Sequence, residues 1–224
     1  MQEYDQRAIA RRIAARFPRP WHRDYVRNKL RFDPAYAAVA AAIDGDDSTP
    51  LLDIGCGLGL LGFYLRERGF RAGYRGLDFD GHKVTIARAV AAGSFADLRF
   101  DTGDAGELPE VRGHVALLDV LHYLPAAAQE KLLRDAAAHV APGATLIVRN
   151  VLRAPGWRFR LTVWEERFMY AVRWMRSPAA HYPSRDEIEE PLRMAGLATD
   201  VRPLWGSTPF NSFAIVARRP ADSA

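Results

Sequence analysis

The fold of this chain is decided by the stretch Pro50-Leu-Leu-Asp-Ile-Gly-Cys-Gly-Leu-Gly-Leu-Leu-Gly62. Its apolar start is typical of a buried strand, and after the acid Asp53 come glycines at alternate positions. Glycine lets the backbone turn tightly and lets a ligand approach without a side chain in the way. An apolar helix follows at once, and a helix N-terminus offers free N–H groups to polar ligand atoms. This order predicts a nucleotide-binding α/β unit.

Length and composition favour a single soluble domain. The 224 residues are 49% apolar and 26% charged, as in globular proteins. No apolar run approaches the roughly 18–20 residues that span a membrane, and the N-terminus has no apolar segment of a secretory signal. The single cysteine, Cys56, permits no disulfide within the chain. A reducing compartment fits this cysteine usage, so we expect a cytoplasmic protein.

Strand-like and helix-like segments alternate from residue 51 onward. Strands are expected at residues 51–54, 71–78, 98–101, 115–120, 144–149, 197–204 and 213–218. Helices are expected at residues 60–68, 82–92, 126–140 and 185–195, the last opened by a Ser184–Glu187 capping box. The alternation predicts a parallel sheet covered on both faces, and the last two strands predict an antiparallel hairpin.

Two segments outside this alternation are helical in character. Residues 1–49 contain three helical stretches and are expected to form an N-terminal lid or arm on a main domain of residues 50–224. Residues 152–183 show no strand signal and are expected to form an inserted cap helix over the substrate. The apolar residues of this insertion recur at helical spacing: Trp157, Leu161, Trp164, Phe168, Val172 and Met175.

Positive charge concentrates in the same two segments. Residues 1–31 carry nine basic side chains against three acidic ones, and residues 151–176 carry six arginines against two glutamates. Both segments are expected over the carboxyl ends of the strands, where open α/β sheets bind ligands and where they would attract an anionic partner. Other interpretations are a solvated basic face, packing of the aromatic stripe on the sheet edge, or a helix resting on an anionic membrane.

The glycines also satisfy a dinucleotide fingerprint. Gly57-Leu-Gly59-Leu-Leu-Gly62 matches G-x-G-x-x-G, and Asp78 follows Gly59 at the distance of a ribose-binding acid. Three features favour another ligand: Asp53 before the glycines, a second acidic turn around Asp104, and the closing hairpin. A dinucleotide-dependent oxidoreductase is the alternative.

Five motifs in succession resemble one family. They are Asp53-x-Gly55-x-Gly57-x-Gly59, Gly76-Leu-Asp78, Gly103-Asp104-Ala105, Asp119-Val-Leu-His-Tyr-Leu124 and Pro142-Gly143. Their order and spacing are similar to those of class I S-adenosylmethionine-dependent methyltransferases, over residues 50–150 and on to about 218. The resemblance implies a Rossmann-like, doubly wound α/β fold with a seven-stranded sheet whose last strand is antiparallel. It also implies S-adenosylmethionine as cofactor and S-adenosylhomocysteine as its product.

The resemblance assigns the methionyl and ribose parts of the cofactor to the first two motifs. Gly55 and Gly57 would lie against the methionyl part and the ribose. Asp53 would lie under the methionyl amine, and Asp78 would accept from both ribose hydroxyls. Lys29, in the N-terminal arm, could reach the cofactor carboxylate.

The resemblance assigns the adenine and the sulfonium to the later motifs. Asp104 would accept from the adenine amino group, Ala105 would donate its N–H to a ring nitrogen, and Phe79 could pack on the base. Asp119 and Leu121 would border the sulfonium. Each acid alone is also compatible with a helix cap or a turn acid.

Candidate catalytic residues are His122 and Tyr123, directly after the fourth strand, and His181, at the end of the insertion. The sulfonium methyl is already activated, so the enzyme mainly aligns a nucleophile, and a phenol or carboxyl oxygen also needs a base or an existing charge. Alternatively, His122 shapes the pocket and His181 is a loop histidine. No metal is expected, because the histidines show no paired ligand spacing.

The aromatic residues and arginines outside the common motifs predict the substrate. We expect O-methylation of a small, apolar or aromatic metabolite that bears an acid. Residues 25–34 and 206–211 also resemble methyltransferases of bacterial aryl polyene pigment pathways, which would imply an acyl or aryl intermediate on an acidic carrier protein. Alternatives are a peripheral membrane lipid methyltransferase and a cofactor-binding protein without catalysis. A nucleic-acid substrate is not expected, and the acceptor atom, base and oligomeric state stay open.

Overall fold

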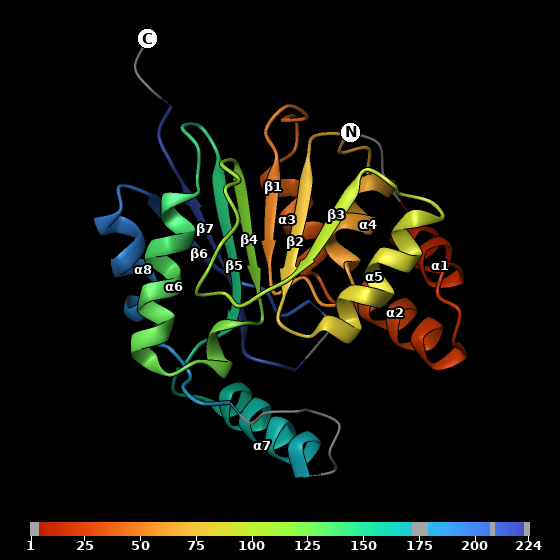
Figure 1. The fold of residues 1–224 in the computed structure, drawn as a ribbon. Coiled ribbons are helices and arrows are strands. Elements are labelled where there is room, and N and C mark those ends of the chain that lie inside the picture. The colour runs from red at the N-terminus through yellow and green to blue at the C-terminus, as the bar shows by residue number, and fades with distance from the viewer. Residues whose placement is uncertain (1–4, 172–178, 207–208, 222–224) are drawn as a thin grey trace.

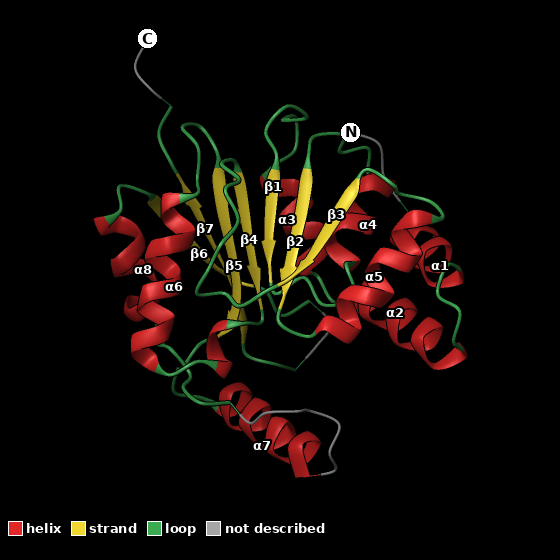
Figure 2. Cartoon of the chain, viewed as in Figure 1, coloured by secondary structure: helices red, strands yellow, loops and turns green. Residues whose placement is uncertain are grey.

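The computed structural model describes residues 5–171, 179–206 and 209–221, with the side chains of 165–171 left out. A twisted sheet stands between two layers of helices (Figures 1 and 2). Its strands are β1 Leu51–Ile54, β2 Tyr74–Asp78, β3 Leu98–Thr102, β4 His114–Leu118, β5 Thr145–Val151, β6 Ala198–Pro203 and β7 Ser212–Arg218. They lie in the order β3-β2-β1-β4-β5-β7-β6.

The pairing of the strands confirms the expected doubly wound α/β sheet. β3, β2, β1, β4 and β5 run parallel to one another. β7 is antiparallel to β5 on one side and to β6 on the other, which is the predicted closing hairpin. Because the first five strands are parallel, their carboxyl ends meet at one edge of the sheet.

Alternate residues of the central strand feed two separate cores. Leu51 faces one core, while Leu52 and Ile54 face the other, as the two-residue period of a strand requires. The first core includes α1 Gln6–Ala15, α2 Pro20–Phe32, α3 Ala35–Ala42, α4 Leu60–Glu67 and α5 Gly81–Ala92. The second includes α6 Ala126–Ala138 and α8 Arg185–Met194.

The N-terminal helices belong to the first core. Ile9, Ile13 and Phe17 are fully buried, and the ring of Phe17 lies 6.2 Å from that of Phe63 on α4. Arg12 and Arg16 of the same segment pair with Glu67 at 2.8 and 3.0 Å. The segment therefore contributes to a helix layer on one face of the sheet. Its role as a lid stays a prediction.

Several strand ends differ from the sequence expectation, and two of the differences have a clear local cause. β2 begins at Tyr74 and not at Arg71, because the guanidinium of Arg66 takes the carbonyls of Phe70 and Ala72, both at 2.8 Å. β4 ends at Leu118 and not at residue 120, because the next residue, Asp119, has φ 59 and leaves the extended conformation. A short 3-10 helix, η1 Leu121–Tyr123, follows.

The insertion forms α7 Trp157–Ala171, which lies beyond the carboxyl ends of the parallel strands in Figure 1. Trp157 and Trp164 are 58% and 65% exposed, so these members of the stripe do not pack on the sheet edge. The Thr162 hydroxyl accepts from the N–H of Asn211 at 2.9 Å and ties α7 to the chain before β7. Val172, Met175 and the side chain of Phe168 lie outside the described residues.

Within the described ranges, the structure contains no helix that is both long enough and apolar enough to cross a membrane.

Gly113→Ala is expected to lower the free energy of unfolding by about 1–3 kcal/mol, as overpacking does. An added Cβ would lie 2.0 Å from the carbonyl oxygen of Pro50, which already accepts from the N–H of His114 at 2.8 Å. Urea unfolding measures the change. Gly93→Ala is the matched control, because the nearest atom to its Cβ would be 3.9 Å away. Equal unfolding midpoints for the two variants would contradict this packing.

Candidate active site

The turn between β1 and α4 is built on left-handed glycines. Gly55 has φ 80, and a Cβ there would lie 2.3 Å from the side chain of Val120. Gly57 has φ 54, but the nearest atom to its Cβ would be Oδ2 of Asp78 at 4.0 Å. Gly55 is therefore required by both conformation and packing, whereas Gly57 borders open space that a ligand could occupy.

The other two glycines of the dinucleotide fingerprint serve packing. A Cβ on Gly59 would lie 2.6 Å from the ring of Phe100 on β3. A Cβ on Gly62 would lie 2.8 Å from the ring of Tyr74 on β2. Both glycines thus let α4 approach the sheet closely, and neither is needed for a pyrophosphate.

Asp78 is held at the end of β2 by backbone donors. Its Oδ2 accepts from the N–H of Gly57 at 2.7 Å, and its Oδ1 accepts from the N–H of Asp80 at 2.9 Å. A carboxylate offers about four acceptor positions, so both oxygens can still accept from ribose hydroxyls. The next residue, Phe79, is 70% exposed, which leaves its ring available to cover an adenine.

Asp53 is buried at the end of β1. Its Oδ2 accepts from the hydroxyl of Tyr74 at 2.5 Å. Burial raises the pKa of Asp53 to about 7, helped by the charge of Asp78 and opposed by the hydrogen bond from Tyr74. The carboxyl therefore titrates near neutral pH, where an approaching ammonium group would favour the ionised form.

The expected adenine contacts lie in the loop between β3 and β4. Asp104 is exposed, and its Oδ1 accepts from the N–H of Gly106 at 2.7 Å, as in a turn. Ala105 packs against the second core. The structure places both residues on the site edge of β3, and their roles toward adenine stay predictions.

Four charged side chains meet beyond β4 and β5. Asp119 forms an ion pair with Arg149, and Lys29 lies 2.6 Å from Asp33 and 3.8 Å from Asp119. Burial opposes ionisation of Asp33, but Arg149 and Lys29 together outweigh it and lower the pKa of that carboxyl. The left-handed φ of 59 at Asp119, a non-glycine residue, marks local strain at this position.

Arg149 was not predicted from the sequence. It ends the apolar run of β5, donates to Ser212 Oγ at 3.0 Å, and its side chain is 14% exposed. Its Nε has no hydrogen-bond partner in the part of the chain that the structure describes. The available signal was a lone charge at the carboxyl end of a buried strand. Lys29, predicted to reach the cofactor carboxylate, is tied to Asp33, and that role stays a prediction.

His122 is buried in η1 and oriented by β5. Its Nδ1 lies 2.9 Å from Oδ1 of Asn150, whose Nδ2 donates to the carbonyl of Val151. The facing amide oxygen suits a proton on Nδ1 of the ring. Leu121, beside it, is fully buried, whereas Tyr123 is 38% exposed.

His181 takes part in the start of α8. Its Nε2 lies 3.0 Å from Oε1 of Glu187, the acid of the capping box. Its N–H and that of Ala180 donate to the carbonyl of His122 at 3.3 and 2.8 Å. The structure thus brings this segment to His122 through the backbone. The catalytic roles proposed for His122, Tyr123 and His181 stay predictions.

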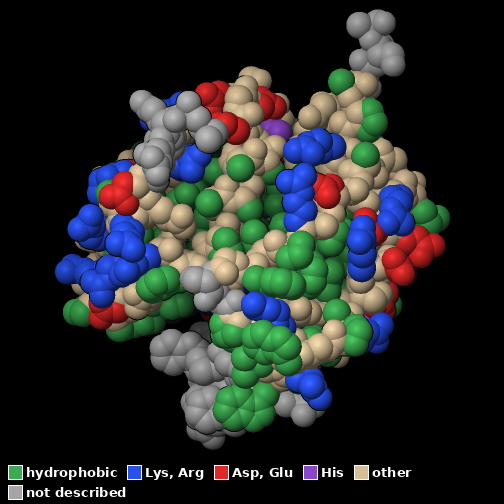
Figure 3. All heavy atoms as spheres, turned by 180° about the vertical axis from the view of Figure 1, so that it is seen from behind, with side chains coloured by type: hydrophobic (Ala, Val, Ile, Leu, Met, Phe, Trp, Pro, Cys, Tyr) green, Lys and Arg blue, Asp and Glu red, His purple; other side chains and the backbone are tan. Residues whose placement is uncertain are grey.

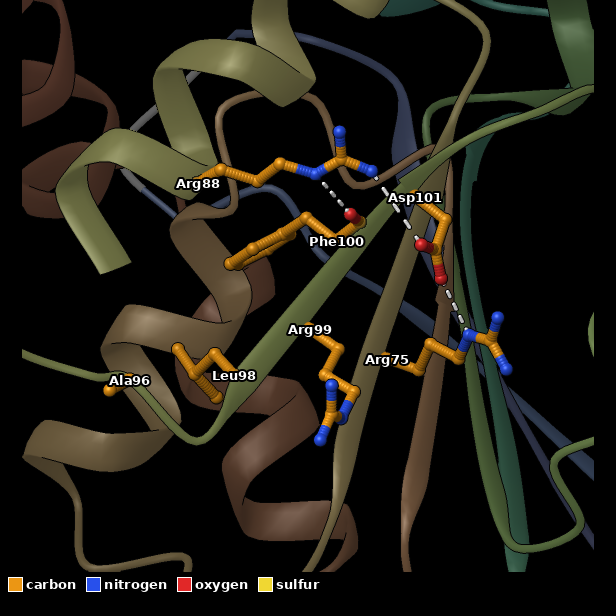
Figure 4. A pocket seen from close by; sticks show the side chains of 7 residues that line it. All are labelled: Arg75, Arg88, Ala96, Leu98, Arg99, Phe100 and Asp101. Atoms are coloured by element: carbon orange, nitrogen blue, oxygen red, sulfur yellow. Dashed lines mark hydrogen bonds and ion pairs between the residues drawn. The ribbon is translucent and has the colours of Figure 1, made fainter. Parts of the chain in front are cut away.

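A separate hollow of about 490 Å³ lies on the β3 side of the sheet (Figure 4). Its lining is Arg75, Arg88, Ala96, Leu98, Arg99, Phe100 and Asp101. Asp101 pairs with Arg75 at 2.6 Å and with Arg88 at 3.6 Å, so two of the three guanidinium groups share one carboxylate. None of the predicted site residues lines this hollow.

The comparison with family models gives one match: residues 51–143 match a methyltransferase domain. The match covers less than half of the chain, so it shows what this segment is similar to. The matched range runs from β1 through the glycine turn to the residues before β5, so it contains most of the residues predicted to contact the cofactor. The comparison with curated proteins gives no match.

Solved structures share the fold. An O-methyltransferase family protein from Burkholderia thailandensis is 17% identical, with a TM-score of 0.66, over 93% of this chain and 63% of that one. Magnesium protoporphyrin IX methyltransferase from Synechocystis PCC 6803, solved with S-adenosylhomocysteine, is 23% identical, with a TM-score of 0.68, over 95% and 93%. A cyclase, SpnF, is 20% identical, with a TM-score of 0.63, over 83% and 80%.

The residues at this edge fit S-adenosylmethionine, the cofactor that the sequence motifs predict. Asp53 offers a buried carboxyl to an ammonium group, and Asp78 offers acceptors to hydroxyls. Gly57 leaves space free of side chains, and Phe79 presents an exposed ring. Among the described residues, no three His, Cys, Asp or Glu side chains gather as a metal site, and the expected absence of a metal stays a prediction.

Asp78→Ala is expected to weaken S-adenosylhomocysteine binding by about tenfold or more, because two charge-assisted hydrogen bonds are lost. Isothermal titration calorimetry measures the dissociation constant. Asp135→Ala is the control, because Asp135 pairs only with Lys131 on the surface of α6. Unchanged affinity in folded Asp78→Ala protein would show that the ribose assignment is wrong.

Proposed function

We propose that this methyltransferase transfers the methyl group of S-adenosylmethionine to an oxygen of a small, apolar or aromatic molecule that bears an acid. The observation that carries the proposal is the pair of cations, Arg149 and Lys29, beside an edge rich in exposed aromatic side chains. When bound, the cofactor supplies a methyl group already activated by its sulfonium. The chain then has to bind the acceptor and align its oxygen.

The cations support an acidic handle on the substrate. Arg149 presents a planar guanidinium that suits a carboxylate, and its Nε has no partner in the described chain. Asp119 and Asp33 neutralise Arg149 and Lys29 in the ligand-free arrangement. A substrate carboxylate would take the place of Asp119 at the guanidinium, and Asp119 would keep Lys29 as a neighbour.

The aromatic residues support an apolar body. Large exposed aromatic side chains gather on the elements that surround this edge, and apolar and basic groups lie together over the end that carries α7 (Figure 3). Exposed apolar side chains that form a contiguous patch mark contact sites for ligands or partners. They are Trp21, Tyr25 and Phe32 on α2, Tyr123 on η1, and Trp157 and Trp164 on α7.

His122 supports transfer to oxygen. Asn150 orients the ring through Nδ1, and in this proposal Nε2 accepts a proton from the acceptor hydroxyl. A substrate that arrives as a phenolate or carboxylate needs no such base. Tyr123, half-exposed beside it, would contact the acceptor.

Two alternatives from the sequence differ in their support. The match of residues 51–143 to a methyltransferase domain favours methyl transfer over a dinucleotide-dependent oxidoreductase. An acidic carrier protein that presents the acceptor remains compatible with the basic N-terminal segment, whose Arg7, Arg11 and Arg19 form no described ion pair. The cyclase structure shares the fold, so the fold alone does not establish methyl transfer.

Incubation of the protein with methyl-labelled S-adenosylmethionine and a cell extract is expected to label a small product. Its methyl group should be lost on ester or ether cleavage, and the product should retain or derive from an acid. Arg149→Gln is expected to reduce transfer about tenfold or more without a comparable loss of S-adenosylhomocysteine affinity, because in this proposal the guanidinium contacts the acceptor and not the cofactor. A labelled amine, or no labelled product in any extract, would contradict O-methylation.

A membrane-resident acceptor is a second candidate. Trp157 and Trp164 are exposed on α7, which also carries Arg158 and Arg160. Exposed tryptophans beside arginines suit the surface of an anionic bilayer. The acceptor would then be a lipid taken from the bilayer.

Vesicle pelleting separates this candidate from a water-soluble acceptor. If it is correct, the protein is expected to sediment with vesicles that contain anionic lipid, and Trp157→Ala combined with Trp164→Ala is expected to abolish this. Sedimentation with neither anionic nor neutral vesicles would remove the membrane candidate.

A further inference from the structure

One buried contact in the site joins two residues on adjacent strands. The hydroxyl of Tyr74 on β2 donates to Asp53 on β1 at 2.5 Å, and the two side chains are 3% and 2% exposed. We propose that Tyr74 is a positioning residue for the cofactor: its hydroxyl orients the Asp53 carboxylate and keeps it ionised to receive the amino group of S-adenosylmethionine. This inference rests on the cofactor named in the proposed function.

The ring of Tyr74 is fixed on two sides, so its hydroxyl has a defined position. On one side Gly62 of α4 leaves just enough room, because a Cβ there would lie 2.8 Å from the ring. On the other side Phe100 of β3 packs edge-on, with ring centroids 5.7 Å apart. A rigid donor of this kind holds one carboxylate oxygen in place without occupying the other.

The second oxygen of Asp53 faces no donor in the described residues. Oδ2 is taken by Tyr74, whereas no hydrogen bond or ion pair reaches Oδ1. The titratable groups that face this carboxyl are Tyr74 and Asp78 of β2, Cys56 of the glycine turn and Tyr36 of α3. None of them is a cation. A buried carboxylate needs a positive partner, and the ammonium group of the ligand would supply it.

The arrangement makes cofactor binding depend on pH. Burial raises the pKa of Asp53 to about 7, and the hydrogen bond from Tyr74 opposes that rise. Only the ionised carboxyl attracts the ammonium group, so affinity should be full above this pKa and should fall as the pH drops through it. Loss of the Tyr74 hydroxyl would raise the pKa of Asp53 further. The affinity for the ligand with the ammonium group would then fall at a higher pH.

The test compares two ligands that differ in the amino-acid part. S-adenosylhomocysteine carries the ammonium group, whereas 5′-methylthioadenosine keeps the nucleoside and the thioether without it. Calorimetry of the full chain is run from about pH 5.5 to about pH 7.5, where the ligand ammonium stays charged. In the wild-type protein, S-adenosylhomocysteine affinity should fall as the pH is lowered, by up to about tenfold per pH unit. The affinity for 5′-methylthioadenosine should stay constant.

Tyr74→Phe should weaken S-adenosylhomocysteine binding about fivefold at pH 7, as expected if Asp53 becomes a tenfold weaker acid. Binding of 5′-methylthioadenosine should not change. Asp53→Asn should remove the difference in pH dependence between the two ligands. Tyr64→Phe is the matched control, because Tyr64 on α4 is buried in the same core and makes no described contact with Asp53.

The outcomes are distinguishable. If pH and Tyr74→Phe change the two affinities equally, Tyr74 acts only in packing and the inference is wrong. If Tyr74→Phe does not fold, the wild-type pH series decides alone. If neither ligand binds at any pH, both this inference and the cofactor assignment fail. Failure of methyl transfer while both ligands bind as expected would overturn the proposed function and leave the role of Tyr74 intact.

Discussion

Parallel pairing of the central strands is the constraint on which the rest of the structure depends. β1 lies between β2 and β4 in parallel register, and β4 pairs in the same sense with β5. Residues that are far apart in the chain therefore arrive at one edge: Asp53, Asp78, Asp119 and Arg149. The helices on both faces bury the apolar side chains of this sheet. The left-handed glycine turn leaves the carboxyl ends of the strands accessible. The residues with proposed roles toward the cofactor and the acceptor all lie at or near this edge.

The proposed site has a cofactor half and an acceptor half, and the two are built in different ways. The cofactor half consists of short turns after β1, β2 and β3, where backbone N–H groups and carboxylates are held by the sheet itself. The acceptor half consists of helices from distant parts of the chain, α2, η1 and α7. Arg149 lies where the two halves meet, because it extends from a central strand and pairs with groups of both. This division explains why a shared cofactor is compatible with a substrate particular to this protein.

Sequence patterns were sufficient to predict the helices and strands and to find the motifs of a candidate cofactor site. Alternating apolar runs located the strands within a few residues, and the glycine turn with its acids located the edge at which the cofactor is predicted to bind. The patterns were insufficient where side chains bond across strands. Neither the Tyr74–Asp53 hydrogen bond nor the Arg149–Asp119 pair leaves a local signal, because each depends on sheet register. The early end of β4 depends on the φ of one residue, Asp119, which no propensity predicts.

The distribution of tryptophan gives this protein a built-in optical reporter. Residues 51–151, which contain the central strands and the cofactor turns, have no tryptophan, and the five indoles of the chain are Trp21, Trp157, Trp164, Trp174 and Trp205. Trp21, Trp157 and Trp164 are exposed on the helices of the acceptor half, and Arg158 lies 4.4 Å from the Trp205 ring centroid. Emission from the described tryptophans therefore originates outside the cofactor turns. In unlabelled protein, tryptophan emission would change when these helices contact a ligand. It would change little when binding is confined to the nucleoside pocket.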